Sequence, residues 1–134
     1  MYIKNNKNAF SLIELIFVIA ILAIIAAVAV PKFLDSRVDA LASSIKQDIS
    51  TVTTAVQSYN MLEGSIFKIT DAVNINEDTW KVSDKKIEFF ESEKLCITIE
   101  LLESKLKVTI LENSGDICEE IYNEGVRSEE YELF

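Results

Sequence analysis

Apolar residues gather near the start of the chain in one uninterrupted run. Positions 15–30 are sixteen consecutive apolar residues. Before them, from Phe10 onward, only Ser11 and Glu14 are polar. As an α-helix, residues 10–30 would be about 31 Å long, close to the roughly 30 Å of a bilayer's hydrocarbon core. The pattern therefore predicts a membrane-spanning helix over residues 10–30.

Beyond Pro31 the apolar residues take up the spacing of a single helix face, with steps of three or four. The residues of this stripe are Leu34, Val38, Leu41, Ile45, Ile49, Val52, Val56 and Tyr59. We expect the helix to continue over residues 31–63 with a kink at Pro31, because proline removes a backbone hydrogen bond. Gly64 can end the helix, because glycine readily adopts a left-handed C-terminal turn. The stripe is expected to pack against the rest of the chain.

Residues 64–134 change to the alternating pattern of β-strands. Three runs rich in β-branched residues occupy 87–89, 95–101 and 106–111, and Val82 favours a shorter strand ahead of them. We expect an antiparallel meander of three or four strands whose apolar face packs on the helix stripe. The predicted fold class is therefore α+β, a long N-terminal helix packed on a small antiparallel sheet.

The charge and composition of the chain argue against two classes of function, nucleic-acid binding and catalysis. The chain carries a net charge of −9, and because Lys4 and Lys7 lie in the first nine residues, the remaining chain carries −11. A body this acidic disfavours nucleic acid, which needs basic groups opposite its phosphates. The sequence contains no histidine, no nucleophile–base pair and no glycine-rich phosphate loop. We therefore expect a protein that is not an enzyme, with no catalytic residues and no cofactor.

Acidic residues dominate the C-terminal tail. They are Glu112, Asp116, Glu119, Glu120, Glu124, Glu129, Glu130 and Glu132, against the single basic residue Arg127. Their spacing does not match the oxygen-ligand loop of a calcium site. A charge run of this kind is typical of a solvated face. We therefore expect no metal, with calcium binding as the alternative.

Three hypotheses compete for the N-terminal segment. The first is a simple signal-anchor, with Lys4 and Lys7 holding the N-terminus in the cytoplasm. The second is a secretory signal peptide, because Ala27 and Ala29 frame an A-x-A-like cleavage site that would release an exported soluble domain after Ala29. The third must explain Glu14, because a carboxylate at the head of an apolar span is costly and marks a functional candidate.

The third hypothesis rests on a resemblance. Residues 7–15, Lys-Asn-Ala-Phe-Ser-Leu-Ile-Glu-Leu, lead into the apolar run, and Pro31 closes it. This segment resembles the prepilin signature of type IV pilins and type II secretion pseudopilins. The matching features are the basic leader over residues 1–9, the small residue Ala9, the aromatic Phe10, the acidic Glu14 and the proline. Ala9 stands where the family usually has glycine, and we expect it to be processed more slowly.

The resemblance implies a maturation pathway and a structural role. A prepilin peptidase would cleave between Ala9 and Phe10, and the new amine of Phe10 would be N-methylated. The Glu14 carboxylate would then neutralise the Phe10 amine of an incoming subunit in an apolar filament core, which fixes the register between subunits. The resemblance also implies the lollipop shape of pilins, in which half of the helix is free for assembly and half is covered by the sheet.

The implied function is that of a structural subunit of a type IV filament, either a type IV pilus or a type II secretion pseudopilus. Its partners would be identical or homologous pilin subunits, prepilin peptidase and an assembly platform. It would cross the inner membrane once, with its N-terminus in the cytoplasm and its C-terminal domain in the periplasm. The sequence leaves open which filament system uses it and whether it is a major or a minor subunit.

Two cysteines, Cys96 and Cys118, lie 22 positions apart. They fit one disulfide and are too few for a zinc site made of cysteines alone. The pair resembles the C-terminal disulfide loop of many type IV pilins, and export to an oxidising compartment favours a bridge over two unlinked thiols. By the chain-entropy model, a loop of this size contributes on the order of 3 kcal/mol to stability.

Overall fold

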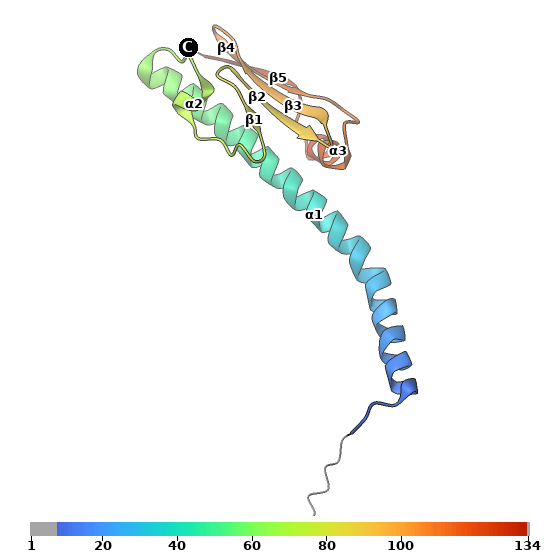
Figure 1. The fold of residues 1–134 in the computed structure, drawn as a ribbon. Helices are drawn as coiled ribbons and strands as arrows, with labels where there is room; N and C mark the ends of the chain where they lie inside the picture. Colours follow the sequence, from blue (N-terminus) through green and yellow to red (C-terminus); the bar gives the residue numbers. More distant parts are fainter. Residues whose placement is uncertain (1–7, 134) are drawn as a thin grey trace, which may run out of the picture. The chain divides into compact units, whose positions relative to one another are not determined.

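The computed structural model describes residues 8–133, so the predicted leader lysines, Lys4 and Lys7, lie outside the described residues. The helix α1, Leu12–Glu63, is the longest element (Figure 1). The chain divides into two compact units between Ser36 and Arg37. The first unit contains the beginning of α1. The second, which we call the head, contains the rest of α1 and all that follows it.

Within the first unit, the described residues form no core. Every one of them from residue 8 to residue 36 is exposed, including the whole apolar run 15–30. This part of α1 is long and apolar enough to cross a membrane, and none of that stretch is buried. Pro31 lies within α1 without ending it. The helix begins at Leu12 rather than at the predicted Phe10, which places the start of the helix after the first polar residue of the segment.

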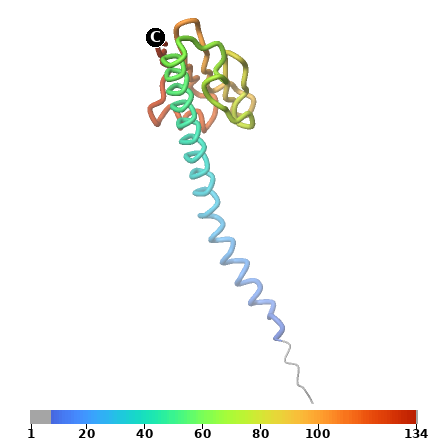
Figure 2. The backbone as a smooth tube through the Cα atoms, turned by 90° about the vertical axis from the view of Figure 1, so that its left-hand side faces the viewer, coloured from blue at the N-terminus to red at the C-terminus, as the bar shows by residue number. Residues whose placement is uncertain are grey.

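The head is a five-stranded antiparallel sheet packed against the C-terminal part of α1 (Figures 1 and 2). The strands are β1 Lys81–Val82, β2 Lys86–Glu91, β3 Lys94–Leu101, β4 Lys105–Ile110 and β5 Glu129–Glu132, in the spatial order β1-β2-β3-β4-β5. Two short helices complete the head: α2, Ile69–Ala72, follows α1, and α3, Asp116–Asn123, precedes β5. Because strands that follow one another in sequence are neighbours in space, the sheet is a meander.

Alternating residues of the central strands build the core of the head. Ile87, Ile99 and Val108 lie side by side across β2, β3 and β4, and all three are buried. The buried face of α1 consists of Ala42, Ile45, Ile49, Val52, Thr53 and Val56. Fully burying one large aliphatic side chain contributes about 1.5–3 kcal/mol, so this contact between helix and sheet contributes strongly to the head's stability.

Outward-pointing residues of the same strands carry charge. Lys86, Glu100, Lys107 and Glu130 follow one another in register across β2, β3, β4 and β5. Each neighbouring pair in this row has opposite signs, and such cross-strand pairs contribute roughly 0.2–1 kcal/mol each. The two faces of the sheet therefore differ as the alternation predicted, one apolar and one solvated.

The predicted α+β class, with a long N-terminal helix and a small antiparallel sheet, is confirmed. The three runs at 87–89, 95–101 and 106–111 correspond to β2, β3 and β4. The predicted number of strands, three or four, was too low, because β5 was not anticipated. Its sequence, Glu-Glu-Tyr-Glu, has no apolar alternation, and it becomes a strand by pairing with β4.

Two further details of the head differ from the expectation. The acidic tail contains the helix α3, whose Cys118 and Ile121 are buried while its acidic side chains are not. A helix of eight residues with two buried positions is too short for its period to stand out in the sequence.

The apolar stripe on α1 was also predicted too long, because Leu41 is 41 % exposed and Ala42 is the first buried residue of the helix.

Candidate processing and assembly site

The predicted cleavage point lies immediately before α1. Residues 8–11 have no regular secondary structure, and the helix starts at Leu12. Ala9 is exposed, and the side chain of Phe10 is 79 % exposed. The peptide bond between these two residues therefore lies in non-helical, accessible chain, which is the condition under which a protease can reach a backbone bond.

Ser11 is the N-cap of α1. Its Oγ accepts a hydrogen bond from the backbone N–H of Glu14 at 3.3 Å, and its carbonyl oxygen accepts one from the N–H of Leu15 at 3.2 Å. A serine followed three residues later by glutamate is the sequence of a capping box, which satisfies amide groups that the first turn of a helix leaves without partners. The same signal is present in the sequence directly before the apolar run, although it was not among the predicted features.

Glu14 lies in the first turn of α1 and is exposed. A carboxylate at this end of a helix interacts favourably with the partial positive charge of the helix N-terminus, typically by about 0.3–1 kcal/mol. Glu14 therefore has a local role at the start of the helix, which the sequence analysis did not consider. Its carboxylate is also accessible to a cation from outside the chain.

The apolar side chains that follow Glu14 point outward around the whole circumference of α1. Ile16, Phe17, Leu22 and Ile24 each have more than half of their area exposed. A helix that is apolar on all sides is stable only when an apolar surrounding covers it. This part of the chain therefore requires lipid or other apolar protein surface around it.

Cys96 on β3 and Cys118 on α3 form a disulfide, with their Cα atoms 5.8 Å apart. Both residues are completely buried. The bond links the central strand of the sheet to α3. The residue directly before α3 is Gly115. The cysteine pair lies in the head, whereas Ala9, Phe10, Glu14 and Pro31 lie in the first unit.

Glu91, at the end of β2, also holds α3 in place through hydrogen bonds. Its two carboxylate oxygens accept hydrogen bonds from the N–H groups of Ile117 and Cys118, each at 3.0 Å. Gly115 has a φ of +147°, and a Cβ at this position would lie 2.3 Å from the carboxyl carbon of Glu91. The carboxylate therefore caps α3 from a distant strand, and no local sequence pattern predicts this contact because the partners are 26 residues apart.

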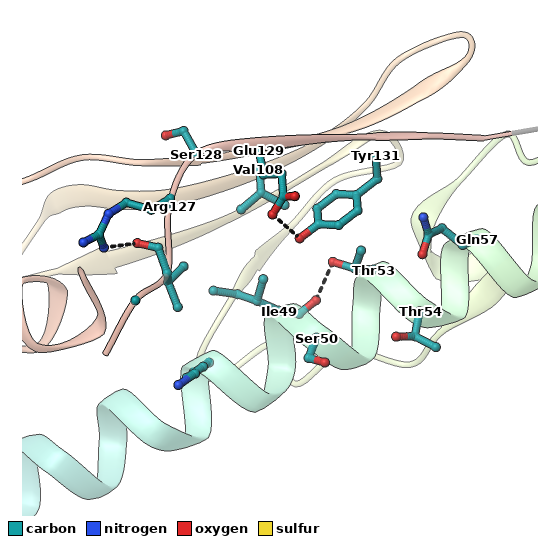
Figure 3. A pocket seen from close by; sticks show the side chains of 13 residues that line it. Ile49, Ser50, Thr53, Thr54, Gln57, Val108, Arg127, Ser128, Glu129 and Tyr131 are labelled. Atoms are coloured by element: carbon teal, nitrogen blue, oxygen red, sulfur yellow. Dashed lines mark hydrogen bonds between the residues drawn. The ribbon is translucent and has the colours of Figure 1, made fainter. Parts of the chain in front are cut away.

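A groove of about 710 Å³ lies between α1 and the segment 125–131 of the head (Figure 3). Two of its polar side chains are hydrogen-bonded within the head: the Tyr131 hydroxyl donates to Glu129 at 2.9 Å, and the Thr53 hydroxyl donates to the Ile49 carbonyl at 2.7 Å. Burial and the hydrogen bond to Glu129 both raise the pKa of Tyr131. None of these groups forms a nucleophile–base pair.

Among residues 8–133, no group of three or more cysteine or acidic side chains is placed to hold a metal ion.

The edge strand β5 carries an ion pair to β4. Lys105 Nζ lies 3.1 Å from a carboxylate oxygen of Glu130 and 3.6 Å from one of Glu132. The hydrogen bond and the charge of Lys105 hold the pKa of Glu130 below its usual value, and the same hydrogen bond raises the pKa of Lys105. The predicted acidic tail is thus partly paired rather than free.

Comparison with known families agrees with the geometry at the start of α1. The family model of the prokaryotic N-terminal methylation motif matches residues 4–30. This match confirms the predicted motif and supports the assignment to the type IV pilin and pseudopilin family. No curated protein and no solved structure matches the chain significantly.

The matched motif supports a class for the protein. It supports a pilin-like subunit that needs prepilin processing, and it points to a structural subunit rather than an enzyme. The pilin family implies assembly with other pilin subunits and processing by prepilin peptidase. The motif and the long apolar part of α1 together fit anchoring in a membrane.

Proposed function

We propose that this chain is a structural subunit of a type IV filament, either a type IV pilus or a type II secretion pseudopilus. The observation that carries the proposal is the joining of the methylation motif at residues 4–30 to an apolar helix that is exposed on all sides. The head supports it as well, because it has its own core and depends on no part of the apolar run for its packing. Polymerisation from the inner membrane brings the apolar helices of neighbouring subunits together and covers them.

In this proposal the precursor is held in the membrane with Lys4 and Lys7 in the cytoplasm and the head on the opposite side. Prepilin peptidase cleaves between Ala9 and Phe10, and the new amine of Phe10 is methylated. The exposed, non-helical chain at this bond supports the assignment. The apolar helix is kept, in contrast to a secretory signal peptide.

The proposed role of Glu14 begins after cleavage. The new Phe10 amine of an incoming subunit is cationic, and the Glu14 carboxylate of the neighbouring subunit neutralises it inside the filament. Removing one partner of a buried ion pair costs about 3–5 kcal/mol, because the other charge is left stranded. The pair therefore selects one axial register between subunits, and Pro31 provides a place where the long helix adapts its direction to its neighbours.

The disulfide between Cys96 and Cys118 supports the same topology. Disulfides persist in oxidising compartments and are rare in the cytosol. The head would therefore fold to its final state after it has crossed the membrane.

The experiment that tests the proposal is intact mass measurement with N-terminal sequencing of the protein isolated from membranes. We expect a mature chain that starts at Phe10 and is heavier by one methyl group. A start at Val30 would instead identify an exported soluble domain released after Ala29, and an intact Met1 would leave a simple signal-anchor or an unprocessed precursor. A cut after Ala29 would fall within the helix α1, whereas the bond between Ala9 and Phe10 lies before the helix begins.

A further inference from the structure

We propose that Ser11 is a positioning residue for leader removal. By capping α1, it starts the helix at Leu12 and so keeps the bond between Ala9 and Phe10 in non-helical chain. The inference rests on the proposed function, because it concerns the rate of the same cleavage.

The geometry on which the inference depends lies in one short segment. Ser11 Oγ accepts the Glu14 N–H at 3.3 Å, and the Ser11 carbonyl accepts the Leu15 N–H at 3.2 Å. Residue Phe10, one position before the cap, is non-helical and 79 % exposed. The cap thus separates helical from non-helical backbone shortly after the scissile bond.

The segment before Ser11 does not stop a helix by itself. Ala9 has the highest helix propensity of any residue, whereas glycine, which the family usually has at this position, is a poor helix former. Asn8 is a strong N-cap residue in its own right. A helix capped by Asn8 would begin at Ala9, and the bond between Ala9 and Phe10 would then lie inside its first turn.

Two caps therefore compete for the start of the helix. With Ser11 as the cap the scissile bond is open, and with Asn8 as the cap it is helical and shielded. When opening and closing are fast, proteolysis follows the population of the open form. Because a serine-to-alanine change at an N-cap costs about 1 kcal/mol of helix stability, Ser11→Ala should shift the equilibrium between the two helix starts about fivefold toward the closed form and lower the cleavage rate by up to that factor.

The test uses full-length precursor in membranes that contain a prepilin peptidase, with the loss of residues 1–9 followed by intact mass over time. We expect Ser11→Ala to be cleaved measurably more slowly than the wild type, by up to about fivefold. Ser11→Thr and Ser11→Asn, which keep a capping side chain, should be cleaved at close to the wild-type rate. The double variant with Asn8→Ala and Ser11→Ala should recover much of the lost rate, because the competing cap is gone.

Backbone chemical shifts of the precursor in detergent micelles provide a readout independent of the peptidase. We expect the first helical residue to move from Leu12 to Ala9 in Ser11→Ala and to return in Ser11→Thr. Equal cleavage rates for the wild type and Ser11→Ala would overturn the inference and leave the proposed function intact. Slow cleavage of Ser11→Thr, or no recovery in the double variant, would also overturn it. A wild-type precursor that is never cut between Ala9 and Phe10 would instead remove the proposed function, and the inference with it.

Discussion

At the scale of single residues, the head depends on a few polar contacts between segments that are distant in sequence. Trp80 is buried, and its indole Nε1–H donates a hydrogen bond to Asp48 on α1 at 2.9 Å. Its ring also lies 5.8 Å from that of Phe89, at an interplanar angle of 57°. Trp80 therefore connects the loop before β1 to both the helix and the sheet. Buried tryptophan usually needs such a partner for its N–H group.

Asp48→Ala should lower the free energy of unfolding by about 1–3 kcal/mol, because it leaves the buried Trp80 N–H without an acceptor. Trp80 is the single tryptophan of the sequence, so its fluorescence reports the transition directly. The measurement is denaturant unfolding of the full chain in detergent micelles. Asp39→Ala, at an exposed position on the same helix, is the matched control and should change stability by less than about 0.5 kcal/mol.

The ion pair between Lys105 and Glu130 predicts a pH dependence. Lys105 lowers the folded-state pKa of Glu130 from its ordinary value of 4.5. A group with a lowered folded-state pKa stabilises the protein above its unfolded pKa, and this contribution is lost as the pH falls through the folded value. Glu130→Gln should therefore reduce stability at pH 7 and have no such effect at pH 2.

The measurement compares unfolding of the wild type and Glu130→Gln at the two pH values in low salt, because salt screens exposed pairs. Glu103→Gln, on an exposed turn without an ion pair among the described contacts, serves as the control. A stability difference between wild type and Glu130→Gln that is the same at both pH values would contradict the ion-pair explanation.

At the scale of elements, α3 is held by contacts from outside its own sequence. The helix α3 has eight residues, and isolated helices of this length are unstable in water. Glu91 caps its N-terminus from β2, and the disulfide to Cys96 fastens it to β3. The strand β5 is the next element after α3, so the same contacts also help to bring β5 to the edge of the sheet.

Glu91→Ala should lower the free energy of unfolding by about 1–3 kcal/mol, because two amide groups at the start of α3 lose a charged acceptor. Amide hydrogen exchange should accelerate first in α3 and β5, which locates the effect. Glu93→Gln, in the exposed turn after β2, is the control and should leave exchange in α3 unchanged. Uniform acceleration across all strands in Glu91→Ala would show that the carboxylate supports the whole head rather than α3.

At the scale of the whole molecule, the two units have opposite surface chemistry. The described residues of the first unit expose apolar side chains on all sides of α1, whereas the head buries its apolar residues and presents charge. A chain of this kind needs an apolar surrounding for one unit and water for the other. A membrane provides both for a single subunit, and a filament provides both for many.

Glu14→Gln separates the two roles of this residue at the level of assembly. Glutamine can replace glutamate in a capping box, so cleavage should proceed, but the charge that neutralises the Phe10 amine is lost. We expect the yield of sheared filaments to fall by about 100-fold or more, the change that about 3–5 kcal/mol per contact produces. Glu63→Gln, at the other end of α1, is the control. Normal filament yield from Glu14→Gln would remove the pairing argument.

Much of the fold was accessible to sequence reasoning, for reasons that differ between segments. The apolar run 15–30 and the stripe from Ile45 to Val56 repeat over many residues, so their periods stand out against chance. The central strands alternate strictly, and β-branched residues at positions such as Ile97 and Ile99 favour extended backbone. The start of α1 at Leu12 could also have been predicted, because a serine followed three residues later by glutamate, as at Ser11 and Glu14, is a local signal for a helix N-terminus.

The sequence by itself determined the helix, the strand alternation and the methylation motif, because each of these depends on neighbours within a few residues. The tertiary structure decided which face of α1 is covered, and it made a strand of β5 and a helix of α3. Glu129, Tyr131 and Glu119 carry no pattern that requires these elements. The strand β5 forms because β4 provides its hydrogen bonds, and the helix α3 forms because Glu91 caps it and Cys96 is bonded to it covalently. These contacts come from segments distant in sequence, and they offset the entropy of ordering a short acidic segment.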